Sequence, residues 1–168
     1  MSIKPMLMIT VGAPGSGKSY LAERLCKDYG MVHLRSDEIR DYVYNSPTYA
    51  PDEQRRLFTF IDFLAKTFLR HGVGVIYDAN FTKRTYRMAL KRLARTCGVQ
   101  FVVLWVQTPL EVAMQRAQRR AFHPVNSEVV LGLHAEIELP KNEPVLIVDG
   151  TKSYKANKTL IDSFLRTL

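Results

Sequence analysis

The residues best suited to chemistry lie in one glycine-rich stretch near the start of the chain. Residues 12–19 read GAPGSGKS and match the pattern G-x-x-x-x-G-K-S/T. The glycines let backbone N–H groups point at phosphate oxygens, and the N-terminus of a following helix adds partial positive charge. Lys18 would reach the β- and γ-phosphates, and the Ser19 hydroxyl would bind Mg²⁺. The expected nucleotide contacts are Gly12, Ala13, Pro14, Gly15, Ser16, Gly17, Lys18 and Ser19.

Two carboxylates stand where further steps of phosphate chemistry need them. Asp37 follows a short apolar run and could accept the proton of an attacking hydroxyl, although it could also simply complement a helix dipole. Asp78 ends the apolar run Val73–Tyr77 and could hold a water of Mg²⁺. Asp149 has the same local pattern, but its place near the end of the chain favours Asp78.

Three arginines close to one another form a further candidate group. Arg116, Arg119 and Arg120 lie at the end of a predicted helix, before a break at Pro124. Such a cluster suits a mobile lid, at roughly residues 116–127, that closes over a triphosphate and balances its charge during transfer. A solvated helix face is the alternative.

The elements that must position these residues alternate along the chain. Apolar, strand-like runs are followed by amphipathic helical patterns, and a capping box, Thr108 to Glu111, predicts one helix start. The expected strands are 6–11, 31–35, 73–77, 100–106 and 144–148; the main expected helices follow the glycine-rich loop, Ser36, Pro51, Thr82, Thr108, Ser127 and Asn157. This order predicts one α/β domain over residues 1–168 with a parallel sheet.

Composition narrows the class of protein. The chain has 168 residues, 46% of them hydrophobic, and no apolar run near the ~20 residues of a membrane span. The N-terminus does not have the pattern of a signal peptide. Cys26 and Cys97 have no partners at metal-site or disulfide spacing, which is typical of a reducing cytoplasm.

The positive charge is concentrated in one part of the chain. Nine Lys or Arg lie between Lys83 and Arg120 against the single acid Glu111, a surplus equal to the net charge of +8. The helix from Thr82 to Cys97 is expected to turn Tyr86 inward and most basic residues outward. That face could bind ATP or a nucleic-acid backbone, or could be an ordinary solvated surface. Its expected contacts are Lys83, Arg84, Arg87 and Lys91.

Four motifs together resemble the phage-type polynucleotide kinase family. These are GAPGSGKS, the run S-D-E-I-R from Ser36, the strand end D-A-N at Asp78, and Q-R-A-Q-R-R up to Arg120. The pattern is also similar to zeta-toxin-like and antibiotic-modifying phosphotransferases, and it covers roughly residues 6–149. The resemblance implies a five-stranded parallel sheet with helices on both faces.

The resemblance also implies roles for particular residues. Asp37 matches the acceptor-side aspartate and Arg40 the arginine one turn later, while Arg116 and Arg120 match arginines that contact ATP. Many relatives carry D-x-T-N where this chain reads Asp78-Ala-Asn80-Phe, so Asp78 carries over and Asn80 departs from the pattern.

These features predict a Mg²⁺-dependent kinase that transfers the γ-phosphoryl group of ATP to a hydroxyl. The 5′-hydroxyl of a polynucleotide is the leading acceptor, and a metabolite, nucleotide sugar or antibiotic is the alternative. Tyr42, Tyr44 and Tyr49 could stack on a base or simply pack. A regulatory ATP-binding module would need neither Asp37 nor an arginine lid.

Overall fold

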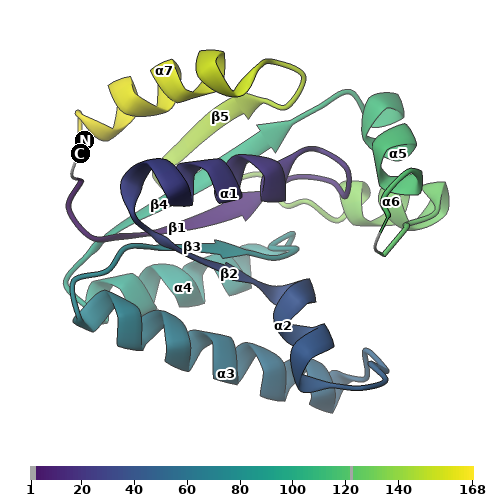
Figure 1. The fold of residues 1–168 in the computed structure, drawn as a ribbon, viewed down its shortest axis with the longest axis horizontal. Coiled ribbons are helices and arrows are strands. Elements are labelled where there is room, and N and C mark those ends of the chain that lie inside the picture. The colour runs from purple at the N-terminus through teal and green to yellow at the C-terminus, as the bar shows by residue number, and fades with distance from the viewer. Residues whose placement is uncertain (1–2, 122) are drawn as a thin grey trace.

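A twisted sheet of five parallel strands forms the centre of the molecule. The computed structural model describes residues 3–121 and 123–168. Within them the strand order is β2-β3-β1-β4-β5, and every neighbouring pair is parallel (Figure 1). The strands are β1 (Met6–Val11), β2 (Val32–Arg35), β3 (Val75–Asp78), β4 (Gln100–Gln107) and β5 (Val145–Asp149). The predicted fold class is confirmed.

Helices cover both faces of this sheet and gather at one of its ends. Helices α1 and α7 pack on one face and α3 and α4 on the other, while α2, α5 and α6 lie at the end where the strands finish (Figure 1). The helices are α1 (Lys18–Tyr29), α2 (Ser36–Val43), α3 (Pro51–Arg70), α4 (Arg84–Thr96), α5 (Leu110–Gln118), α6 (Ser127–Ala135) and α7 (Tyr154–Leu165).

The central strand β1 shows why the sheet is buried on both sides. All six of its residues are buried. Leu7 and Ile9 join the core under α3 and α4, whereas Met6 and Met8 join the core under α1 and α7. Alternate side chains of a strand point to opposite faces, so an apolar run with no polar face requires two covering layers.

The glycine-rich loop after β1 is held against α5. Gly15 has a φ of 83°, and a Cβ there would lie 2.0 Å from the carbonyl oxygen of Ala113. Thr108 Oγ1 donates a hydrogen bond of 2.9 Å to the carbonyl of Ser16. The predicted capping box is therefore wrong: α5 begins at Leu110 without a side-chain cap, and the Thr108 hydroxyl fixes the loop instead.

The inward face of α4 also differs from the prediction. Tyr86 is 61% exposed, and Arg87 is completely buried. Arg87, Leu90 and Ala94 share one face because Leu90 and Ala94 follow Arg87 by three and seven positions, and Tyr86, one position before Arg87, is rotated about 100° from it. At α2, Ser36 is the first helical residue, with Arg35 rather than Ser36 in the N-cap position.

Among the described residues, no helix combines the length and the apolar character needed to cross a membrane.

Candidate functional site

A cavity of about 600 Å³ opens at the end of the sheet where β2 and β3 finish and α1 begins. Its walls come from the glycine-rich loop, α1, α2, the residues after β3, and the segment between α5 and α6. It gathers the principal residues that the sequence analysis selected: Lys18, Ser19, Asp37, Asp78 and Arg120, with Asn80 beside them.

Lys18 is a buried cation at the first position of α1. Its ammonium group donates hydrogen bonds of 2.8 and 3.0 Å to the carbonyl oxygens of Gly12 and Ala13. The pKa of Lys18 is lowered to about 8, mainly by burial; Arg120 also lowers it, and Asp78 and Asp37 partly offset these effects. All three side chains thus lie within electrostatic reach of the ammonium group.

Asp78 is a buried anion at the end of β3. Burial alone would raise the pKa of its carboxyl group, but hydrogen bonds and the nearby Lys18 hold that pKa at about 2. Thr10 Oγ1 donates to Asp78 Oδ1 at 2.7 Å, and His33 Nε2 lies 3.3 Å from Asp78 Oδ2. The sequence analysis missed both partners. Thr10 could have been noticed because it is a polar residue inside the otherwise apolar strand β1. No sequence pattern pointed to His33.

The oxygens of Ser19 and Asp78 suit a magnesium ion. Mg²⁺ takes oxygen ligands and is commonly held by one or two protein groups together with substrate phosphates. No cluster of three or more His, Cys, Asp or Glu occurs among residues 3–121 and 123–168, so phosphate oxygens would have to complete the set. Asp149 lines a different cavity, beyond the glycine-rich loop, and accepts hydrogen bonds from Thr151.

The far end of the cavity differs in character from the Lys18 end. Asp37 lies in the first turn of α2, with Arg35 and Tyr49 beside it. Apolar side chains from the other side complete the lining, namely Pro124, Val125, Val129 and Leu133. His123 Nε2 lies 2.6 Å from Asp41 Oδ2, which connects the lid segment to α2.

Arg40 does not line this cavity, contrary to its predicted catalytic role. Its guanidinium group is buried, pairs with Glu53 and donates to Gln54 at 2.5 Å. The Tyr49 ring lies 4.5 Å from it. These contacts indicate a structural role for Arg40, because they hold the loop before α3 and thereby the position of Tyr49.

The lid arginines lie on two sides of the phosphate loop. Arg120 lines the main cavity. Arg116 donates a hydrogen bond of 2.8 Å to the carbonyl of Gly150 and lines a second cavity of about 370 Å³ beside Gly17 and Tyr20. The roles of Arg116 and Arg120 as ATP contacts remain predictions. Part of the predicted lid, residue 122, lies outside the described residues.

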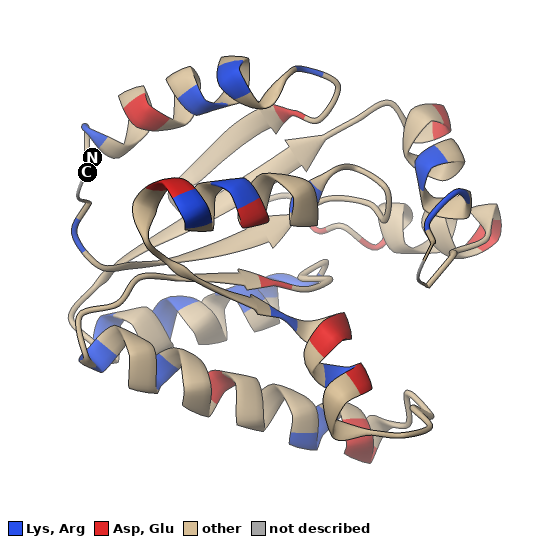
Figure 2. Cartoon of the chain, viewed as in Figure 1, with Lys and Arg blue, Asp and Glu red and all other residues tan. Residues whose placement is uncertain are grey.

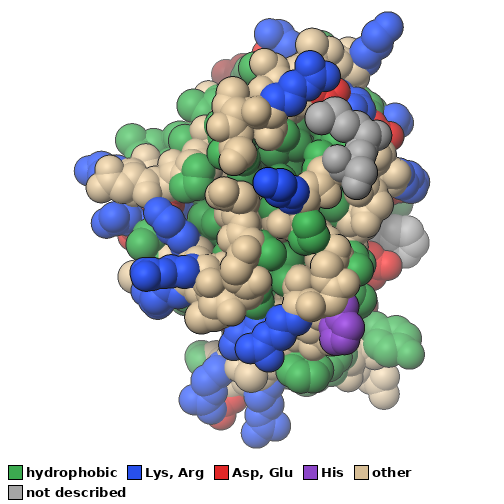
Figure 3. All heavy atoms as spheres, turned by 90° about the vertical axis from the view of Figure 1, so that its left-hand side faces the viewer, with side chains coloured by type: hydrophobic (Ala, Val, Ile, Leu, Met, Phe, Trp, Pro, Cys, Tyr) green, Lys and Arg blue, Asp and Glu red, His purple; other side chains and the backbone are tan. Residues whose placement is uncertain are grey.

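The basic face predicted on α4 is only partly a free surface: Arg84 is exposed, whereas the other three predicted contacts interact within the chain. Arg87 is completely buried, Lys91 donates to the carbonyl of Asn142 at 3.0 Å, and Lys83 lies 3.9 Å from Glu136. Lys and Arg are distributed over α1, α3, α4, α5 and α7 (Figure 2). Lys and Arg side chains also form separate groups on the end of the molecule that faces away from α2, α5 and α6 (Figure 3). The clustering of charge in the sequence therefore does not become one nucleic-acid face.

Comparisons with known proteins identify the family of this chain. A family model described as "AAA domain" (AAA_33) matches residues 7–140. An adenylyl-sulfate kinase of Myxococcus xanthus is 30% identical over 109 residues, which are 62% of this chain and 59% of that enzyme. The chain thus matches a little over half the length of that relative.

Solved structures with the same fold include two further kinases. The Mycobacterium tuberculosis APS kinase in complex with AMPPNP and APS has a TM-score of 0.74 at 18% identity, with 98% of this chain and 99% of that one covered. A gluconokinase from Sinorhizobium meliloti 1021 has a TM-score of 0.72 at 19% identity, covering 99% and 94%. The chain belongs to the AAA domain family AAA_33.

The lowered pKa of Lys18 predicts proton uptake when a nucleotide binds. Phosphate charges beside the ammonium group favour its protonated form, so near pH 8 binding of AMPPNP should take up a fraction of a proton. Near pH 6 this uptake should vanish, because Lys18 is already charged. The test is calorimetry in buffers of different ionisation enthalpy.

Two variants separate Lys18 from other groups in this measurement. Lys18→Met should remove the uptake, while Lys27→Met, at an exposed lysine of the same helix, should retain it. Equal proton uptake in Lys18→Met and the unaltered protein would show that Lys18 is not the titrating group.

Proposed function

We propose that this chain is an ATP-dependent kinase that transfers the γ-phosphoryl group of ATP to a hydroxyl group of a small anionic molecule. One observation carries this proposal. A single cavity contains Lys18 and Ser19 of the phosphate loop, Asp78 on the metal side, Asp37 on the acceptor side and Arg120 of the lid. These are the groups that phosphoryl transfer needs, because its catalysis is mostly positioning and charge stabilisation.

Asp37 is the group that accepts the proton. The acceptor hydroxyl loses its proton to the Asp37 carboxylate as its oxygen forms a bond to the γ-phosphorus. The bond from that phosphorus to the bridging β–γ oxygen breaks, and ADP leaves. Asp37 is partly buried, and its carboxylate lies within electrostatic reach of the Lys18 ammonium group.

Lys18 and Arg120 stabilise the charge of the transferred group. Both are positive, both line the cavity, and Lys18 is held by two carbonyls of its own loop. Mg²⁺ bound at Ser19 and Asp78 would neutralise part of the phosphate charge. The cavity beside Gly17, Tyr20 and Arg116 offers space for the remainder of the nucleotide.

The acceptor end favours a small anion with an apolar or planar part. Arg35, Arg120 and His123 supply positive or donor groups, and Tyr49, Val129 and Leu133 add aromatic and apolar surface to the same cavity. A cavity of about 600 Å³ has the size of a small-molecule site. The kinases compared above are named for anionic acceptors, adenylyl sulfate and gluconate.

The other two functions have less support. A polynucleotide acceptor was favoured by the basic segment, but Arg87 is buried and Lys83 and Lys91 contact other parts of the same chain. A regulatory ATPase has no need of Asp37 at a separate acceptor end with an apolar wall.

Removal of the proposed base should affect the rate and spare nucleotide binding. Asp37→Asn keeps the size of the side chain and should lower kcat by roughly 10²- to 10⁴-fold, with the Kd for ATP little changed. The matched control is Glu38→Gln at the exposed neighbouring acid. Equal losses in both variants, or a loss of thermal stability without a specific loss of rate, would remove Asp37 from the mechanism.

The acceptor class can be tested with γ-labelled ATP. The panel contains adenylyl sulfate, gluconate, neutral sugars, nucleosides and a 5′-hydroxyl oligonucleotide, each with Mg²⁺. Transfer should favour the small anions and should change little with moderate salt, since few charges are neutralised. Preferential labelling of the oligonucleotide, with a steep loss at high salt, would restore the polynucleotide alternative.

A further inference from the structure

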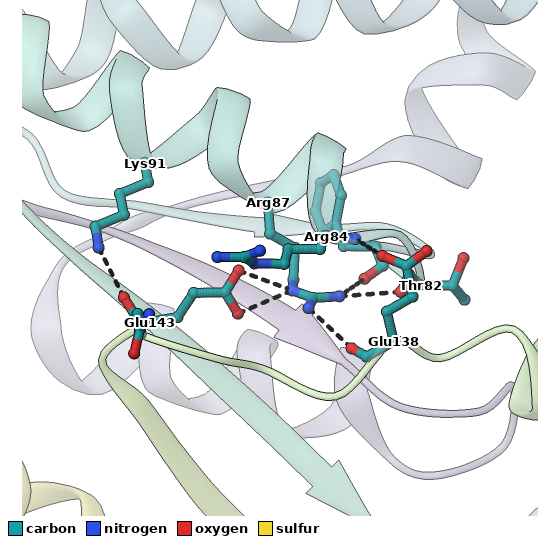
Figure 4. A network of polar contacts seen from close by, with 8 residues as sticks. Thr82, Arg84, Arg87, Lys91, Glu138 and Glu143 are labelled. Carbon is teal, nitrogen blue, oxygen red and sulfur yellow. Dashed lines mark hydrogen bonds and ion pairs between the residues drawn. The ribbon is translucent and has the colours of Figure 1, made fainter.

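The largest side chain that is fully buried in this protein belongs to Arg87, on the inner face of α4. Its Nε donates to the carboxylate of Glu143 at 3.1 and 3.3 Å, and neither side chain is exposed. Its Nη1 donates to the carbonyls of Phe81 and Thr82 at 3.1 and 3.0 Å, and Nη2 donates to the carbonyl of Glu138 at 2.8 Å (Figure 4). One guanidinium therefore holds three main-chain carbonyls and a carboxylate.

These partners belong to two segments that both lead to the cavity. Phe81 and Thr82 lie in the loop after β3, which brings Asn80 to the cavity wall. Glu138 and Glu143 lie between α6 and β5, and α6 contributes Val129 and Leu133 to the opposite wall. Arg87 thus connects two segments: the loop that follows Asp78, and the segment between α6 and β5.

Glu138 reinforces this junction. Its backbone N–H donates to the carbonyl of Thr82 at 2.9 Å, and its carboxylate accepts a hydrogen bond of 2.7 Å from the backbone N–H of Arg84. The carboxylate also lies at the N-terminus of α4, where negative charge is favourable. Figure 4 shows both segments converging on the guanidinium group.

A buried ion pair usually adds little to the free energy of unfolding of a protein. Two apolar side chains of similar volume often stabilise a core as well or better, because neither has to be dehydrated as a charge. A planar guanidinium adds something that they lack, which is several donors in fixed directions. The specific contribution of Arg87 is the placement of the carbonyls of Phe81, Thr82 and Glu138.

We propose that Arg87 is a positioning residue for phosphoryl transfer: it fixes the loop 79–83, so that Asn80 and the end of β3 keep their places in the cavity, and it ties that loop to the segment between α6 and β5. The proposal rests on the proposed kinase function. Displacement of reacting groups by about 1 Å can lower a rate by 10²-fold, so a loosened loop should reduce kcat. Nucleotide affinity should change little, because the phosphate loop lies between β1 and α1 and packs against α5. The hydrogen bonds of Arg87 go to other segments.

The test compares a single and a double replacement. Arg87→Met leaves Glu143 buried without its partner and should lower the melting temperature. Arg87→Met combined with Glu143→Met removes both charges and should recover most of that loss. We expect the double variant to retain a roughly 10- to 100-fold lower kcat with an unchanged Kd for ATP. Arg92→Met, at an exposed arginine of the same helix, is the control.

A second readout does not depend on kinase activity. Backbone amides of residues 79–83 and 136–143 should exchange with deuterium faster in the double variant than in the unaltered protein, while those of α1 should not change. Arg87→Lys keeps a positive charge for Glu143 but loses the several donors of the planar guanidinium. This variant should therefore show the same faster exchange.

The outcomes are distinguishable. A double variant with the stability, kcat and hydrogen exchange of the unaltered protein would overturn the positioning role. If the double variant does not fold, Arg87→Lys decides, and an unchanged kcat and exchange would overturn it. Absence of transfer by the unaltered protein would instead contradict the kinase function, and the exchange data would still decide whether Arg87 fixes the loop.

Discussion

The buried charge of Lys18 is the constraint on which the rest of the site depends. Its ammonium group has three hydrogens, and two of them donate to the carbonyls of Gly12 and Ala13. One donor remains for an anion. Burial opposes the charge strongly enough to bring the pKa to about 8, so negative groups must stand nearby. Asp78 is such a group, and Thr10 and His33 keep it ionised and oriented.

The parallel sheet brings these groups together from distant parts of the chain. Because all strands run in one direction, their carboxyl ends meet at one edge, where ligands of open α/β sheets bind. β3 lies between β1 and β2, so Asp78 pairs in register with Arg35, immediately before α2 and Asp37. The lid residue Arg120 reaches the same edge through β4 and α5. A single strand order therefore brings Asp78, Asp37 and Arg120 together.

Much of this arrangement was predictable because it follows from local patterns. The glycine-rich loop, the apolar strands and the aspartates at strand ends are each encoded within a few residues, and the structure places Lys18, Ser19, Asp37, Asp78 and Arg120 in one cavity. The sequence pattern did not reveal which charged side chains turn inward. Arg87 was expected on the basic outer face of its helix, and Arg40 was assigned to catalysis through the resemblance to polynucleotide kinases. Their burial depends on Glu143 and Glu53, and pairing of this kind is set by tertiary contacts. The hydrogen bond from the Thr108 hydroxyl to the carbonyl of Ser16 was not predicted for the same reason, because the two residues are 92 positions apart in the chain.

A crystal structure with AMPPNP and Mg²⁺ tests the central claim most directly, namely that one cavity holds both the triphosphate and the acceptor side. We expect the γ-phosphate within hydrogen-bonding distance of Lys18 Nζ, with Ser19 and Asp78 on the magnesium side. We also expect Asp37 to face the open side of the γ-phosphate, where an acceptor hydroxyl would approach. A nucleotide bound outside the glycine-rich loop, or a γ-phosphate directed away from Asp37, would contradict this claim.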